Sequence, residues 1–135
     1  MKIKLLFLIA ALIGAIILCM PERKKSNQAK VNDTVFSTAI ETAQKSIDFA
    51  KNNQARAFAE QTFEFNKNRN GYYECYQLLQ NIQPPADAKW DVSRDLNSNN
   101  INVSCALNKK LKLLIVLKKL PDNSMKFAYA CTLNT

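Results

Sequence analysis

Residues 101–133 read INVSCALNKKLKLLIVLKKLPDNSMKFAYACTL, and this stretch decides the fold of the chain. Apolar and polar side chains alternate over residues 101–108 and 125–133, which is the pattern of half-buried β-strands. Residues 111–117 lie between them and form a nearly continuous apolar run, as in a central strand. The stretch therefore predicts an antiparallel β-meander whose apolar face is covered by a helix.

The register of the first hairpin follows from the length of its loop. A loop of three residues places Cys105 opposite Leu113 and Val103 opposite Ile115. A two-residue loop would instead place Lys112 on the apolar face that carries the cysteine, so the longer loop is predicted.

Shorter elements precede this hairpin. Residues 72–82 have the spacing of a short amphipathic helix, which two consecutive prolines end. Residues 88–94 contain Trp90 and Val92 in alternation and predict a weak additional strand. We therefore expect an α+β fold with a sheet of three to four strands at 88–134.

A long helix is predicted before these elements. Residues 26–66 contain no proline or glycine and many alanines, which favours one continuous helix. The polar run that ends in Gly71 is a common helix stop. A second interpretation starts the helix at Asn32, a residue type that caps helices, and leaves 21–32 as a linker.

A narrow apolar stripe with a period of 3.5 residues runs along this helix. Its members are Phe36, Ile40, Ala43, Ile47 and Ala50. In one interpretation the stripe packs on the protein's own sheet. In the other it packs against copies of the chain or against a partner helix.

The N-terminal segment 1–20 is the predicted membrane element. Residues 5–20 carry no charge, and sixteen residues give a helix of about 24 Å, slightly short for a bilayer core of about 30 Å. The run is long for a cleaved signal peptide, and Leu18 before Cys19 does not suit a lipoprotein site. A signal anchor is favoured over a signal peptide, followed by a single domain at 21–135.

The charges on either side of this segment leave its orientation open. Lys2 and Lys4 precede it, whereas Arg23, Lys24 and Lys25 follow it, and a strict count of flanking cations could keep the domain in the cytoplasm. A short basic start followed at once by an apolar run is typical of export signals. We expect a single-pass membrane protein with its domain on the extracytoplasmic side, periplasmic or at the cell surface.

The residue types present argue against catalysis. The chain has no histidine, which excludes a histidine-based catalytic triad or histidine metal ligands. It has no Cys-x-x-Cys motif and no glycine-rich phosphate-binding loop. Asp87, Asp91 and Asp95 are interpreted as solvated side chains, because nothing near them would raise a carboxyl pKa. No catalytic residue, cofactor site, metal site or small-molecule substrate is predicted, and the chain is not expected to be an enzyme.

Three cysteines of the domain are candidates for a disulfide. If Cys105 and Cys131 lie on strands separated by a third, their Cα atoms are at least about 9.6 Å apart, too far for a bond. Cys75 lies on the helix expected to cover the sheet, so a Cys75–Cys131 or Cys75–Cys105 bond is predicted. The other interpretation is three buried, reduced cysteines in a cytoplasmic core.

The net charge of +8 suggests affinity for anionic surfaces such as lipid headgroups, cell-wall polymers or nucleic acid. A basic patch is predicted at the end of the sheet. It would consist of Lys109, Lys110, Lys112, Lys118, Lys119 and Lys126. The alternative is an ordinary solvated basic surface.

The order of these elements resembles that of type IV pilins and minor pilins. An apolar helix is followed by Pro21, a long amphipathic helix and an antiparallel sheet that contains cysteines. The prepilin peptidase motif is missing, as is the acidic residue early in the apolar helix. The resemblance implies a membrane-anchored subunit that assembles with itself or with an envelope complex. The other function considered is an exported binding module that contacts a polyanion, and salt-dependent binding would distinguish it.

Overall fold

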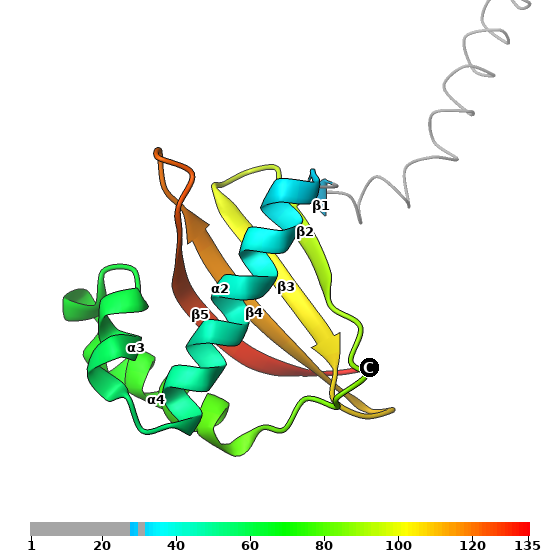
Figure 1. The fold of residues 1–135 in the computed structure, drawn as a ribbon, viewed down its shortest axis with the longest axis horizontal. Coiled ribbons are helices and arrows are strands. Elements are labelled where there is room, and N and C mark those ends of the chain that lie inside the picture. Colours follow the sequence, from blue (N-terminus) through cyan, green and yellow to red (C-terminus); the bar gives the residue numbers. More distant parts are fainter. Residues whose placement is uncertain (1–27, 30–31) are drawn as a thin grey trace, which may run out of the picture.

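The computed structural model describes residues 28–29 and 32–135 and shows an α+β fold (Figure 1). Its helical elements are α2 (Asp33–Lys51), α3 (Ala55–Gln61), the 3-10 helix η1 (Phe65–Lys67) and α4 (Arg69–Asn81). Its strands are β1 (Gln28–Ala29), β2 (Asp91–Asp95), β3 (Asn100–Ala106), β4 (Leu111–Lys119) and β5 (Met125–Asn134). The strands form one antiparallel sheet in sequence order, from β1 at one edge to β5 at the other.

The predicted membrane helix at residues 5–20 lies outside the described residues. Among the residues that are described, no helix is long and apolar enough to cross a bilayer.

The prediction of one continuous helix over 26–66 is wrong. The chain is in strand β1 at residues 28–29, and α2 begins after Asn32, whose side chain accepts a hydrogen bond from the backbone N–H of Val35 at 2.9 Å. This is the capping arrangement that the second interpretation expected. The helix ends at Lys51 because Asn53 takes a left-handed conformation with φ 58°, which asparagine tolerates better than most residues.

Asn53 provides a test of this break. Its side-chain oxygen also accepts a hydrogen bond from Gln80 Nε2 at 2.9 Å, which joins the turn to α4. We expect Asn53→Ala to lower the free energy of unfolding by about 1–2 kcal/mol, because alanine pays the steric cost of the left-handed region. Urea titration of the full chain in detergent micelles measures this. The neighbouring Asn52→Ala, at φ −94°, should cost less than about 0.5 kcal/mol, and equal losses would contradict the explanation.

The polar run at 66–71 begins a helix rather than ending one. The Asn68 side chain accepts a hydrogen bond from the backbone N–H of Gly71 at 3.2 Å and so caps α4. The predicted short helix at 72–82 therefore starts three residues earlier, at Arg69, and ends at Asn81 just before the two prolines. The additional strand predicted at 88–94 is present as β2, Asp91–Asp95.

The predicted register of the first hairpin is confirmed, with Cys105 opposite Leu113 and Val103 opposite Ile115. The alternation predicted along the last strand is correct as far as Phe127 and wrong after Ala128. Leu117 pairs with Phe127 but Val116 pairs with Tyr129, so Ala128 is an extra residue in a β-bulge. A shift of one residue exchanges the two faces of a strand, so every side chain after Ala128 lies on the face opposite to the predicted one.

The core lies between the helices and one face of the sheet, here called the inner face (Figure 1). α2 contributes Ala39, Ala43, Ile47 and Ala50, and α4 contributes Tyr76 and Leu79. Phe58 of α3 is buried between Tyr76 and Phe127, with ring centroids at 5.1 and 5.0 Å. The helix-covered sheet expected from the alternating strands is thus confirmed.

Candidate functional site: a groove beside an edge strand

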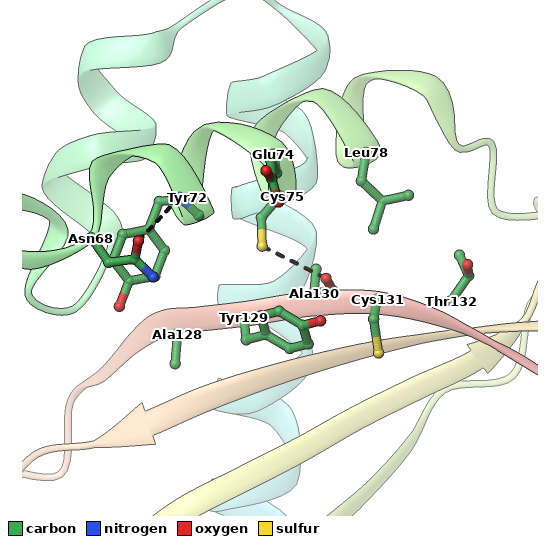
Figure 2. A pocket seen from close by; sticks show the side chains of 11 residues that line it. Asn68, Tyr72, Glu74, Cys75, Leu78, Ala128, Tyr129, Ala130, Cys131 and Thr132 are labelled. Carbon is green, nitrogen blue, oxygen red and sulfur yellow. Dashed lines mark hydrogen bonds between the residues drawn. The ribbon is translucent and has the colours of Figure 1, made fainter.

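A groove of about 400 Å³ lies between α4 and β5 (Figure 2). α4 runs alongside the strand, and the groove is lined by Asn68, Tyr72, Cys75 and Leu78 from the helix and by Ala128–Thr132 from the strand. Since β5 is the last strand of the sheet, this groove follows an edge of the sheet.

Two carbonyl groups show how the backbone of β5 is oriented. Phe127 O accepts a hydrogen bond from the backbone N–H of Phe63 at 2.7 Å, and Ala130 O accepts one from the Cys75 thiol at 3.6 Å. Both donors lie outside the sheet. In an antiparallel pair, residues that turn their N–H and C=O away from the neighbour alternate with those that bond to it. Thr132 follows Ala130 by two residues, so its backbone groups also point away from β4, toward the open edge.

The two halves of this edge differ. The first half is covered, because Thr62 and Phe63 pair with Phe127 and the Lys126 ammonium donates to Glu60 O at 2.9 Å. The second half, residues 129–134, contains no proline, glycine or charged residue. Proteins normally protect exposed edges with charges, prolines or bulges, since unpaired strand backbones pair with other chains. The second half of β5 therefore has the properties of a strand-binding edge.

The aromatic and aliphatic side chains around the edge are partly exposed. Tyr129 is 52 % exposed and Leu133 is 42 % exposed, both on the outer face of the sheet, which the described helices leave open (Figure 1). At the groove mouth, burial raises the pKa of the Tyr72 hydroxyl, and the Glu64 carboxylate adds to the shift. Tyr72 is therefore an uncharged hydrogen-bonding group at neutral pH.

The cysteines lie in three different places. Cys75 faces β5 from α4, Cys105 is buried on β3, and Cys131 points away from α4 on the opposite side of β5 (Figure 2). All three are free, so neither predicted disulfide is present in the structure. The bulge at Ala128 explains this for Cys131, since it turns that side chain to the outer face. Cys105 lies on β3, two strands or about 9.6 Å away from β5, the strand that Cys75 faces, which explains why Cys75 and Cys105 are not bonded.

The thiols are poor nucleophiles. Burial raises the pKa of Cys75, of Cys105 and of Cys131 above the usual thiol value. Because the thiolate is the reactive form, all three remain largely protonated at neutral pH. Their placement fits packing and hydrogen bonding.

The predicted interaction stripe on α2 divides into two parts. Ala43, Ile47 and Ala50 are buried in the core, so they pack on the protein's own sheet, as the first interpretation expected. Ile40 packs against the same core and is half-buried, while Phe36 is 38 % exposed at the start of the helix. The stripe is therefore mainly a core element and leaves little apolar surface for a partner helix.

The six lysines do not form one patch, contrary to the prediction. Lys109 and Lys110 lie in the β3–β4 turn with Lys112 close by, whereas Lys118 and Lys119 lie at the other end of β4. Lys112 and Lys118 are six positions apart along the strand, or about 20 Å. Lys118 Nζ also lies 5.8 Å from the centroid of the Phe63 ring. Lys126, at the β5 start, pairs with Lys118.

A second cavity of about 500 Å³ lies where α2 begins. It is lined by Asn32, Thr38, Arg94, Lys119 and other residues. In the described part of the chain no group of three or more acidic or cysteine side chains is arranged to hold a metal ion.

The groove cannot be recognised from the sequence pattern. A signal was present in the uncharged run at 127–135, but the alternation placed Tyr129, Cys131 and Leu133 on the buried face. Only the bulge shows that these side chains lie outside.

No protein-family model matches the sequence, and comparison with curated proteins and with solved structures gave no match.

Proposed function

We propose that this chain is a membrane-anchored, extracytoplasmic interaction protein that binds an extended protein segment along the edge of β5. The observation that carries the proposal is the unprotected second half of β5 beside an open groove. An added strand would hydrogen-bond to the backbone of Ala130 and Thr132 and would lie beneath α4. Leu78 and Tyr72 would contact its side chains.

The anchor belongs to the same proposal. The uncharged run at 5–20 with lysines before it supports insertion in a membrane and export of the domain. A subunit held at a membrane meets its neighbours at high local concentration, so modest strand pairing is sufficient for assembly. A pilin-like subunit of an envelope filament or secretion assembly is one protein of this kind. A polyanion-binding module is less well supported, because the lysines are divided between the two ends of β4.

The proposal is tested with a photo-crosslinking amino acid at Thr132 of the full chain, expressed in membranes. We expect the protein to stay in the membrane after carbonate extraction, and to give one discrete adduct on illumination. The matched control carries the same amino acid at Ala106, an exposed residue on β3 away from the edge. Equal adducts at the two positions, or none at Thr132, would reject edge binding. Extraction by carbonate would reject the anchor.

A further inference from the structure

We infer that the segment bound at this edge is β5 of a second copy of the same chain, paired antiparallel across a two-fold axis. This inference rests on the proposed function and names its partner. Two identical edge strands related by a two-fold axis pair antiparallel, and such a closed dimer removes both open edges at once.

The distribution of charged side chains favours a second copy of the chain as the partner at this edge. The chain has a net charge of +8, which disfavours contact between its basic surfaces, but residues 127–135 carry no charged side chain. The backbone N–H of Thr135 donates to Lys110 O at 2.9 Å, which places this lysine beside the far end of β5. In an antiparallel dimer that end lies along the groove of the other copy, which Glu74 lines. The end of β5 in one copy thus carries a lysine, and the groove of the other copy carries a glutamate of opposite charge.

The direction of the backbone groups determines the register. Phe127 is already paired with Phe63 and Ala128 is the bulged residue, so the open half is residues 129–134, in which Ala130 and Thr132 turn their backbone groups away from β4. Cys131 lies midway between these two residues. With the axis at Cys131, Ala130 of one copy lies opposite Thr132 of the other, and both turn their backbone groups to the new neighbour.

This register makes a specific geometric prediction. Cys131 lies opposite its own copy in a non-hydrogen-bonded pair, where Cα atoms are about 4.5 Å apart. A disulfide requires about 4.4–6.8 Å. Both thiols lie on the outer face of the sheet, away from α4 (Figure 2). The two Cys131 side chains are therefore within bonding distance of each other in the dimer.

The first experiment oxidises the full chain in detergent micelles with copper-phenanthroline at mildly alkaline pH, in a Cys19→Ser background. We expect a disulfide-linked dimer on a non-reducing gel, and its loss in Cys131→Ser. Sedimentation should show that Cys131→Ser still self-associates, because the backbone pairing remains. Failure of the parent to form the dimer, or an undiminished dimer in Cys131→Ser, would overturn the register at Cys131.

The second experiment places like charges across the axis. Cys131→Lys and Cys131→Glu should each weaken self-association by about tenfold or more, since like charges directly opposite one another destabilise a strand pair. An equimolar mixture of the two variants should recover the association. Unchanged self-association of both single variants would overturn pairing through β5.

The crosslink at Thr132 separates this inference from the proposed function. An adduct of two copies of this chain supports both. An adduct with a different protein leaves the proposed function standing and rejects self-pairing. Absence of any adduct at Thr132 rejects both.

Discussion

Replacing Phe58 with alanine is expected to destabilise the domain by about 3–5 kcal/mol. Phe58 is 1 % exposed, and it is the residue through which α3 reaches both α4 and β5. Its ring packs edge-on against Tyr76 and tilted against Phe127, with centroids about 5 Å away in each case. Truncation removes both aromatic contacts and leaves a cavity beneath the covered half of the β5 edge.

Such a loss is a large part of the free energy of unfolding of a domain, which is usually about 5–15 kcal/mol. Urea titration of the full chain in micelles, followed by the fluorescence of Trp90, measures it. The matched control is Phe36→Ala, since Phe36 is 38 % exposed and should cost no more than about 1 kcal/mol. If the two variants lose the same stability, Phe58 is not the buried connection described here.

Local chemistry explains what could be predicted. The β3–β4 hairpin was predicted to the residue because a period of two, a lysine that has to stay out of the core, and a three-residue loop all agree on one register. Asn32 was identified as a possible cap for the same reason, since the hydrogen bond from Val35 depends on three neighbouring residues.

The predictions of secondary structure were wrong where a single residue changed the structure of the residues after it. Asn53 ends α2 through a positive φ, although no proline or glycine is present to signal a break. Ala128 inserts a bulge into a strand whose residues alternate without interruption in the sequence. Nothing local distinguishes Ala128 from Ala130. The residue before the bulge, Phe127, packs against Phe58 and pairs with Phe63, contacts with residues that are distant in the sequence.

The candidate site could not be predicted either, because it also depends on contacts between residues that are distant in the sequence. The open edge of β5 is a property of strand order, because a strand becomes an edge only when no other strand lies beside it. The uncharged run at 127–135 could be seen in the sequence, but it was equally compatible with a buried central strand. The lysine patch was predicted because the six lysines are close in the sequence. The length of β4 places them at opposite ends of that strand.

The second large effect is expected from Ile47→Asp, which tests whether the stripe on α2 belongs to the core. Ile47 is 5 % exposed and lies in the same buried cluster as Ala43, Ala50 and Leu113. Aspartate there would place a charge in this buried cluster, and Lys51, one turn further along the same helix and partly exposed, would have to leave solvent to pair with it. We expect the free energy of unfolding to fall by about 3–5 kcal/mol, a large part of the usual 5–15 kcal/mol of a domain.

Phe36→Asp is the matched control, because Phe36 lies on the same stripe of the same helix but is partly exposed. It should leave the fold intact, as judged by Trp90 fluorescence of the full chain in micelles. The pair also separates the two interpretations of the stripe. If Ile47→Asp keeps the unfolding midpoint while assembly in the membrane is lost, the stripe binds a partner. If Ile47→Asp unfolds the chain while Phe36→Asp keeps both fold and assembly, the stripe is core, and the edge of β5 remains as the surface for association.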